Sequence, residues 1–485
     1  MAGVVWRRVD RWLTWFHRWA GVVLSALVLL WFLSGAVLHF VGFPNLTRED
    51  RLAHEEPISQ DRVLVAPAAI EGVADEVGLR LISVAGRPVY IESRSGGLPV
   101  AVAADTGGVL PLFSASTAGD IAGRFGHAPV LAVSRPIEYD QWVVPQDFDP
   151  WRPMYRVRLG DAMGTELYVS ARTGEVVQAT TSRQRAWNWC GAIVHWIYFT
   201  PLRKSTSRWD LTVWWISLAA LISAVVGFWL GMVRLAANKA ARRPGLSPFR
   251  RWMRWHHVLG IFASVVVLGW LLSGWLSMDD GRIFPEPYPT QQESDGMRGI
   301  GFADLVRAVT LNDLHAVGPA VQVSFDAVGG HSFMDIQPSG GARPYIRWLG
   351  PGPDTSSGSL SDAALSAGLG AIWPGRVGGQ LVNDSLDDFY RHAEGLPNSV
   401  VGFRLLGPGA TRVYVDRYSG QLLAIVGPGR RAYDWVYYAL HTLKFPVLLD
   451  HPDIRTLIEL MLLALGVAFS STGVILSVKR VKRSF

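Results

Sequence analysis

Long apolar stretches and shorter alternating segments divide the chain into two kinds of region. A helix needs about 20 consecutive, predominantly apolar residues to cross a bilayer. Four stretches of the sequence have that length, so four transmembrane helices are predicted. They are Ala20–Phe40, Leu211–Val233, Val258–Met278 and Ile454–Val478.

Two long loops separate the first span from the second and the third from the fourth. Residues Glu166–Val177 alternate apolar and polar positions on both sides of a Gly-containing turn, which is typical of a β-hairpin, and Arg412–Val426 repeats this pattern. Helices are expected at Pro67–Val77 and Phe302–Ala308, and the Gly- and Pro-rich stretch Pro338–Gly358 is expected to be a loop. Each long loop is therefore predicted to form a small α+β domain.

The two halves of the sequence align with each other. A shift of 239 residues places the first span on the third, and a shift of 246 residues places the region around the second span on the fourth. The fold class predicted is thus a membrane α-helical protein built as a tandem repeat of helix, extracytoplasmic α+β domain and helix. Since both copies have the same topology, they are expected to pack about a pseudo-two-fold axis along the membrane normal. The aligned pairs include His17 with His256, Gly35 with Gly274, His195 with His441 and Gly227 with Gly473.

Positive charge indicates which side of the membrane each connection occupies. Lys and Arg cluster before the first span, between the second and third spans, and after the fourth, so these segments are expected in the cytoplasm and both long loops outside. The first span is expected to be an uncleaved anchor. The net charge of +6 fits this topology, and no nucleic-acid partner is expected. The predicted organisation is 1–40 (N-terminus and first span), 41–184 (first outer domain), 185–233 (interfacial helix and second span), 234–254 (cytoplasmic linker), 255–278 (third span), 279–430 (second outer domain), 431–478 (interfacial helix and fourth span) and 479–485 (cytoplasmic tail).

A single cysteine, Cys190, limits the redox chemistry that the chain can support. It cannot form a disulfide within the chain, attach haem covalently through a C-x-x-C-H motif, or ligate an iron–sulfur cluster. Any redox centre must therefore be held by His, Met or Tyr side chains.

Four histidines at aligned positions are the main candidates for cofactor ligands. His17 and His256 lie at the cytoplasmic ends of their spans, and each heads a stripe of glycines on one helix face. His195 and His441 lie in Trp- and Tyr-rich segments ahead of the second and fourth spans, which are expected to be short helices at the outer interface. Two pairs are predicted, each suited to hold the iron of a b-type haem as axial ligands, which gives two haems.

Several alternatives remain open at this point. A histidine at the end of a span is often only an interfacial anchor. His39 and the aligned Met278 are alternate ligands at the outer face, and His257 is an alternate to its neighbour His256. The other histidines lie in the outer loops without metal-like clustering and are interpreted as surface residues; they are His54, His127, His315, His331, His392 and His451.

No flavin or nicotinamide site is expected in this chain. Gly299-Ile300-Gly301 and Gly368-Leu369-Gly370 lack the strand–helix context of a dinucleotide-binding fingerprint. An electron donor would then be a separate reductase or a membrane quinol. Candidate contacts for an acceptor outside the membrane are Asp140, Trp142, Asp279, Asp280, Asp387 and Tyr390, although an ordinary loop surface is the favoured interpretation of each.

These motifs together resemble a known family. His17-Arg18-Trp19-Ala20-Gly21, with Ser34-Gly35 closing the span, resembles the start of PepSY-associated transmembrane proteins. The hairpins with Tyr168-Val169 and Thr173-Gly174, and with Tyr414-Val415 and Ser419-Gly420, resemble the PepSY signature, and His195 and His441 match the family's Leu-His motif. The second copy reads His-His-Val-Leu-Gly, which leaves His256 or His257 open, and Trp196-Ile197 and Thr442-Leu443 follow where the family often has Thr-Gly.

The resemblance implies an iron-regulated protein of the bacterial inner membrane, in a family that includes ferric-siderophore reductases with two haems. It implies His17, His195, His256 and His441 as the ligands. The function expected is electron transfer across the membrane to an extracytoplasmic acceptor, with a ferric siderophore as the first candidate. The alternatives are a non-catalytic PepSY-type binding or regulatory protein and, less well supported, a transporter, since Glu459 is the only acidic residue within the spans.

Overall fold

The computed structural model describes residues 2–73, 76–94, 96–279, 281–353, 358–381 and 385–483. The chain divides into two compact units, which we call the helical unit and the sheet unit. The helical unit comprises Met1–Phe43, Gln184–Pro285 and Arg431–Phe485, and the sheet unit comprises Pro44–Arg183 and Glu286–Arg430.

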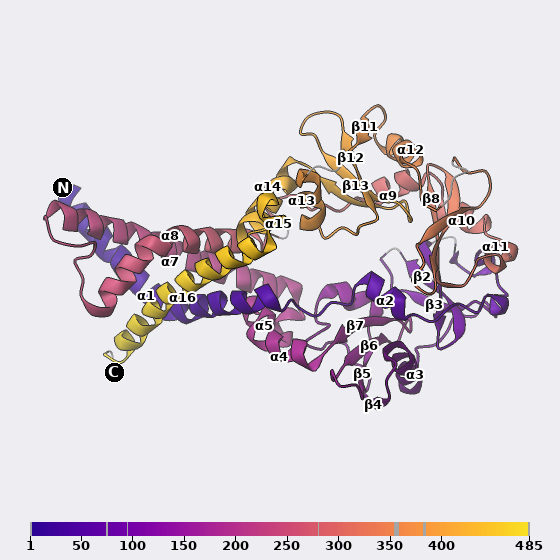
Figure 1. Cartoon of the computed structure of the whole chain (residues 1–485), viewed down its shortest axis with the longest axis horizontal. Helices are drawn as coiled ribbons and strands as arrows, with labels where there is room; N and C mark the ends of the chain where they lie inside the picture. Colours follow the sequence, from indigo (N-terminus) through magenta and orange to yellow (C-terminus); the bar gives the residue numbers. More distant parts are fainter. Residues whose placement is uncertain are drawn as a thin grey trace. The chain divides into compact units, whose positions relative to one another are not determined.

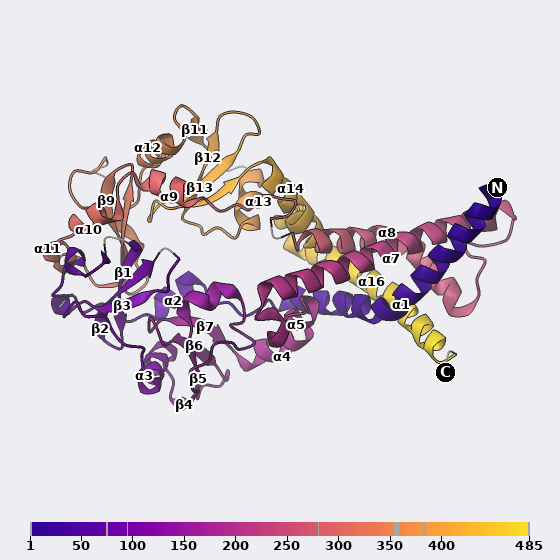
Figure 2. The ribbon, with the colours of Figure 1, turned by 180° about the vertical axis from the view of Figure 1, so that it is seen from behind.

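Four long helices form the helical unit, and each contains one of the predicted spans (Figures 1 and 2). All four are long and apolar enough to cross a membrane, which confirms the four predicted helices. The first and third helices each pack against both the second and the fourth, so the four form a closed bundle with an apolar core. The helices are α1 (Ala2–Phe40), α7 (Thr206–Ala240), α8 (Arg251–Leu276) and α16 (Pro452–Val481).

Short helices precede α7 and α16, as the aromatic segments predicted. The short helices that end at His195 and His441 pack on the bundle. The first, α5, contacts α1, and the second, the π-helical turn η5, contacts α8. Two residues beyond each histidine, Ile197 and Leu443 have φ angles of 53° and 51°, and this left-handed backbone reverses the chain. The short elements are α4 (Ser182–Cys190), α5 (Ala192–His195) and α6 (Thr200–Arg203), then α14 (Pro428–Asp434), η5 (Trp435–His441) and α15 (Pro446–Leu449).

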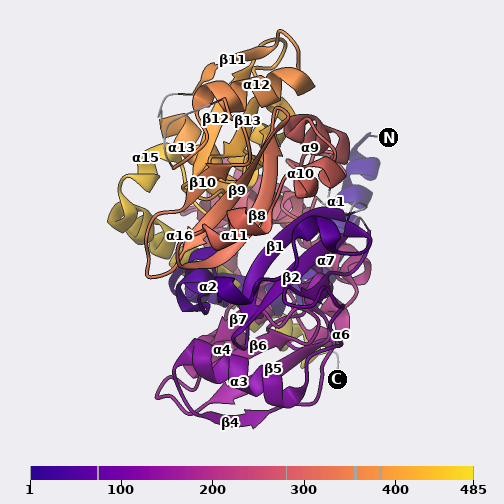
Figure 3. The ribbon, with the colours of Figure 1, turned by 90° about the vertical axis from the view of Figure 1, so that its right-hand side faces the viewer.

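In the described part of the sheet unit, the strands form three antiparallel sheets. The largest has the order β10-β9-β8-β1-β2-β3 and takes strands from both long loops, because β1 pairs with β8 (Figure 3). The two loops, which were predicted as separate domains, therefore share one sheet. The pairing gives hydrogen-bond partners to backbone groups of β1 and β8 that would otherwise lie at an exposed sheet edge. The strands are β1 (Glu76–Val84), β2 (Arg87–Arg94), β3 (Val100–Ala103), β8 (Ala320–Val328), β9 (His331–Pro338) and β10 (Tyr345–Trp348).

Each loop also contributes a four-stranded sheet of its own, and both contain a predicted hairpin. The β6–β7 and β13–β14 pairings confirm these hairpins. The sheets are β4 (Val130–Val133), β5 (Met154–Leu159), β6 (Glu166–Ser170) and β7 (Val176–Thr180), and β11 (Val377–Gln380), β12 (Val400–Leu405), β13 (Arg412–Asp416) and β14 (Leu422–Val426). The described helices of this unit are α2 (Arg48–His54), η1 (Gln60–Arg62), η2 (Pro67–Ala69), α3 (Ala115–Gly126), η4 (Gln146–Trp151), α9 (Gln291–Arg298), α10 (Phe302–Arg307), α11 (Leu311–His315), α12 (Asp362–Ile372) and α13 (Ser385–Ala393).

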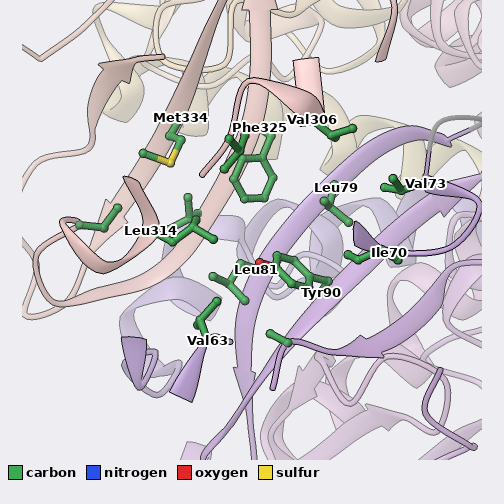
Figure 4. Packing of buried hydrophobic residues seen from close by; sticks show 14 of the residues in the cluster. Val63, Ile70, Val73, Leu79, Leu81, Tyr90, Val306, Leu314, Phe325 and Met334 are labelled. Atoms are coloured by element: carbon green, nitrogen blue, oxygen red, sulfur yellow. The ribbon is translucent and has the colours of Figure 1, made fainter. Parts of the chain in front are cut away.

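The apolar face of the shared sheet holds residues of both loops in one core (Figure 4). Leu79, Leu81 and Tyr90 of the first loop pack with Phe325 and Met334 of the second, and all five are almost fully buried. Burying each such side chain contributes about 1.5–3 kcal/mol. The shared core explains why the two loops form one unit.

Two local predictions in the loops are wrong. The helix expected at Pro67–Val77 is a single 3-10 turn at Pro67–Ala69, and β1 already begins at Glu76, where alternating leucines face the core; residues 74 and 75 lie outside the described part. The stretch expected as a loop, Pro338–Gly358, contains β10, which pairs with β9. The helix expected at Phe302–Ala308 is confirmed as α10.

Candidate functional site

Two pairs of histidine rings lie inside the helical unit. His17 on α1 and His256 on α8 have ring centres 6.3 Å apart, with planes inclined by 36°. His195 at the end of α5 and His441 at the end of η5 have ring centres 6.4 Å apart, with planes inclined by 60°. The structure thus brings together the histidines that the sequence alignment paired.

Serine hydroxyls set the protonation of the outer pair. Ser34 donates its hydroxyl hydrogen to a carbonyl one turn earlier in α1 at 2.6 Å, so its oxygen accepts from Nδ1 of His195 at 3.0 Å. Ser273 likewise donates within α8 at 2.7 Å and accepts from Nδ1 of His441 at 3.0 Å. Both imidazoles therefore carry their proton on Nδ1, and Nε2 keeps its lone pair.

The inner pair is held in the same protonation state by different partners. Nδ1 of His17 donates directly to the carbonyl oxygen of Ser223 at 2.9 Å. Nδ1 of His256 donates to the hydroxyl of Thr472 at 2.9 Å, and that hydroxyl donates onward to the carbonyl of Phe469 at 2.6 Å. Among the described residues, Nε2 has no hydrogen-bond partner in any of the four histidines.

A glycine of a neighbouring helix faces each ring. A Cβ atom would lie 3.0 Å or less from the imidazole at Gly227 and Gly274, so the missing side chain makes room for the ring there, whereas at Gly35 and Gly473 it would lie at an ordinary 3.5 Å and 3.7 Å. Gly35 and Gly274 come from the stripes that the sequence identified, and Gly227 and Gly473 are an aligned pair. The contacts join Gly227 to His17, Gly473 to His256, Gly35 to His195 and Gly274 to His441.

Two tryptophans hold the backbone of the outer histidines. The indole N–H of Trp31 donates to the carbonyl of His195 at 2.9 Å, and that of Trp270 donates to the carbonyl of His441 at 2.9 Å. Both tryptophans lie in the middle of predicted spans. Their hydrogen bonds place the short helices against α1 and α8.

Burial keeps the outer pair neutral. Desolvation lowers the pKa of His195 to about 4 and the pKa of His441 to about 3, and in His441 the neighbouring His195 lowers it further. A neutral imidazole with a free Nε2 is the form that binds a metal ion.

A cavity of about 820 Å³ surrounds the inner pair. Residues of all four long helices line it, including both His17 and His256, and its walls are largely apolar. Arg18, Arg250 and Arg480 are among the basic residues that line it. A volume of roughly 300–1,000 Å³ is typical of sites for small molecules and cofactors.

Comparison with known families identifies the chain. The profile of the PepSY-associated TM region matches residues 14–290, which is more than half of the 485 residues. The chain belongs to the PepSY-associated TM family. The match and the four apolar helices together make it a multi-pass membrane protein. The matched region contains His17, His195 and His256, while His441 lies beyond it. No curated protein matches the chain.

The alternate ligands occupy other environments. Both ring nitrogens of His39 are engaged, Nδ1 with the Glu459 carboxylate at 3.0 Å and Nε2 with the Thr456 hydroxyl at 3.0 Å. His257 directs Nε2 to the carbonyl of Gly231 on α7 at 2.9 Å, so His256 is the member of the His-His dipeptide that faces His17. Met278 lies just beyond the end of α8.

The acceptor contacts named from the sequence are engaged in internal contacts. Asp279 accepts two backbone N–H groups at 2.7 Å, and Asp140 pairs with Arg156 at 2.9 Å. Asp387 is buried against Arg412 at 2.9 Å. Trp142 and Tyr390 are buried, and Asp280 lies outside the described residues.

The sequence did not reveal the partners of the histidines. Ser34 and Ser273 recur at aligned positions, each directly before a glycine of the stripe, and this recurrence was the signal available. Thr472 gave no such signal, because the aligned residue is Val226.

Proposed function

We propose that this chain is a haem b-containing membrane oxidoreductase that passes electrons across the membrane to an extracytoplasmic acceptor, with a ferric siderophore as the first candidate. One observation carries the proposal: four part-buried histidines in two facing pairs are all protonated on Nδ1, which leaves Nε2 available. Hydrogen bonding of the second ring nitrogen is the usual arrangement of metal-binding histidines.

The spacing of the pairs fits one metal ion between two rings. With metal–imidazole bonds of about 2.0–2.1 Å on opposite sides of an ion, two ring centres lie roughly 6.3 Å apart. The observed separations are 6.3 Å and 6.4 Å. Bound b-type haem would supply one-electron redox chemistry at these positions.

Around the inner pair, the cavity has the chemistry to hold a porphyrin. Its apolar walls, which include Val28, Val267 and Leu271, would exclude water from the macrocycle, and Phe469 stacks on the His256 ring at 5.1 Å. Arg18 and Arg480 line the same cavity and would pair with the carboxylates of the ligand.

Around the outer pair, the chain's own residues would hold the ligands in place. Ser34 and Ser273 fix the tautomer, while Trp31 and Trp270 hold the backbone of the segment that presents each ring. Because the ring orientation, tautomer and backbone of both histidines are fixed in advance, the site would rearrange little when the bound group changes redox state.

We also propose that the two halves form a tandem repeat about a pseudo-two-fold axis. The support is that aligned residues make equivalent contacts. Trp31 and Trp270 bind aligned carbonyls, Ser34 and Ser273 bind aligned imidazoles, and the left-handed residues Ile197 and Leu443 are aligned as well. The axis would pass between the two rings of each pair.

The proposed topology follows the positive-inside rule: a bacterial inner-membrane protein with both termini in the cytoplasm and both long loops in the periplasm. Electrons would enter from a separate reductase or a membrane quinol, because no flavin or nicotinamide site is expected in this chain. Reduction of ferric iron weakens its bonds to hard oxygen ligands, so an outward-directed reductase would release iron from a siderophore.

A redox difference spectrum with haem quantitation on the purified protein tests the proposal. We expect two haems per chain, one lost in His17→Ala and in His256→Ala, and the other lost in His195→Ala and in His441→Ala. A protein without a Soret band, expressed in haem-replete cells, would refute it. Chemically reduced protein should then be reoxidised by a ferric siderophore but not by its gallium analogue. If His17→Ala and His256→Ala left cellular function unchanged, a regulatory role would be favoured.

A further inference from the structure

Two histidines of the sheet unit, far apart in the sequence, face each other at its surface. His54 is the last residue of α2, and His127 directly follows α3. Their ring centres lie 6.3 Å apart with planes inclined by 39°, and both side chains are exposed. From the sequence they are expected to be surface residues without metal-like clustering, but the fold brings them together.

The ring of His54 is held in a ligand-like state. Its Nδ1 donates to the carbonyl oxygen of Asp50, one turn earlier, at 2.8 Å. A carbonyl oxygen can only accept, so Nδ1 carries the proton and Nε2 keeps its lone pair. The ring also packs against the largely buried Phe125, with centres 5.1 Å apart, which limits the rotamers available to it.

The backbone positions His127 beside it. His127 has a φ of 47°, a left-handed conformation that is uncommon outside glycine. This residue ends α3, where the last carbonyl groups of the helix favour a nearby positive charge. The adjacent Arg124 side chain is already paired with Glu56 at 3.0 Å, which reduces its repulsion of a bound cation.

We propose that His54 and His127 form a two-histidine site for a divalent transition-metal ion. Imidazole nitrogen is a favoured ligand of Cu²⁺, Ni²⁺ and Zn²⁺, and the usual order of affinity makes Cu²⁺ the tightest. The described residues provide no group of three or more His, Cys, Asp or Glu side chains at one point, so water completes the coordination. This site is independent of the proposed haem function, since it uses neither histidine pair of the helical unit.

Copper titration of the full-length protein as purified tests the proposal. We expect one Cu²⁺ ion to bind with an electron paramagnetic resonance spectrum that shows coupling to two imidazole nitrogens. His54→Ala and His127→Ala should each weaken binding by about tenfold or more and leave coupling to at most one nitrogen. An equal concentration of Zn²⁺ should not displace the copper, because Cu²⁺ binds imidazole ligands more tightly.

His392→Ala is the matched control. His392 is also exposed and also directs Nδ1 to the carbonyl four residues earlier, Asp388, at 2.7 Å, but no second histidine ring lies against it in the described structure. Copper binding should be unchanged in this variant. Native protein without a saturable copper site, or His54→Ala and His127→Ala proteins that bind as tightly as the native one, would overturn the proposal.

Discussion

Substitution of Gly227 by alanine should remove His17 as a ligand while sparing the outer pair. A Cβ atom at this position of α7 would lie 2.9 Å from Nδ1 and 3.0 Å from Nε2 of His17, and closer still to Cε1. Ordinary carbon contacts are about 3.5–4.0 Å, so the ring must retreat by more than about 1 Å to clear Cε1, its nearest atom. Metal–ligand distances tolerate only about 0.2 Å, so a ring displaced by that much cannot stay bound.

The energetic cost is of the size of a typical overpacking substitution, about 1–3 kcal/mol. The helix itself gains from the change, because alanine is favoured over glycine in a helix interior by about 1 kcal/mol. Loss of the protein fold is therefore not expected. The effect should be confined to the inner pair and to the hydrogen bond from His17 to Ser223, which is 2.9 Å long.

The assay is low-temperature electron paramagnetic resonance combined with haem quantitation. One low-spin ferric signal should convert to high spin or disappear, and the other should persist. Gly473→Ala is an internal comparison, because a Cβ atom there would lie at an ordinary 3.7 Å from His256 and the effect should be much weaker. Gly269→Ala, which meets no atom within 4 Å, is the neutral control. Equal damage from Gly473→Ala and Gly227→Ala, or no change in either, would refute the steric reasoning.

Three further predictions follow from individual contacts. Ser273→Ala should weaken haem binding at the outer pair by about 10–100-fold, because the Nδ1 proton of His441 loses its acceptor, and Ser273→Thr should restore much of it; titration of haem into apoprotein measures both. His39→Ala and His257→Ala should keep both low-spin haems, since Glu459 and Thr456 occupy both ring nitrogens of His39 and the ring of His257 directs Nε2 to the Gly231 carbonyl on α7. Loss of a haem signal in either variant would contradict the assignment. Burial, and secondly the nearby carboxylate of Asp335, raises the pKa of Asp326 to about 8. The folded state therefore holds a proton on Asp326 that the unfolded state releases near pH 4. The free energy of unfolding should then fall by up to about 1.4 kcal/mol for each pH unit between about pH 4 and pH 8. Asp326→Asn should flatten that decline in pH-dependent thermal unfolding, whereas substitution of the exposed Asp304 by Asn should not.

The bundle and its candidate ligands were accessible from the sequence for a direct reason. A membrane span must be about 20 apolar residues long whatever surrounds it, so the four helices are encoded locally. The internal alignment then selected His17, His195, His256 and His441 among 12 histidines, because residues at aligned positions are expected to face one another. Local alternation likewise predicted both hairpins.

Other features depended on contacts between distant residues. The sequence divided the loops into two domains, but pairing of β1 with β8 joins them in one sheet, and no local pattern encodes which strand a partner edge will meet. Whether His256 or His257 faces His17 depended on how α7 and α16 pack against α8. The Thr472 hydroxyl that accepts the hydrogen bond from Nδ1 of His256 lies on a different helix, at a position where the aligned residue is a valine.

The sequence by itself thus determined the spans and the candidate ligands, because membrane thickness and internal alignment act on residues at fixed spacing. Only the tertiary structure decided which nitrogen of each ring is free, that His39 is fully engaged, and that His54 and His127 meet. These depend on hydrogen bonds and ring contacts a few ångströms long between segments that are remote in the chain, and such contacts arise only once the helices and strands have packed.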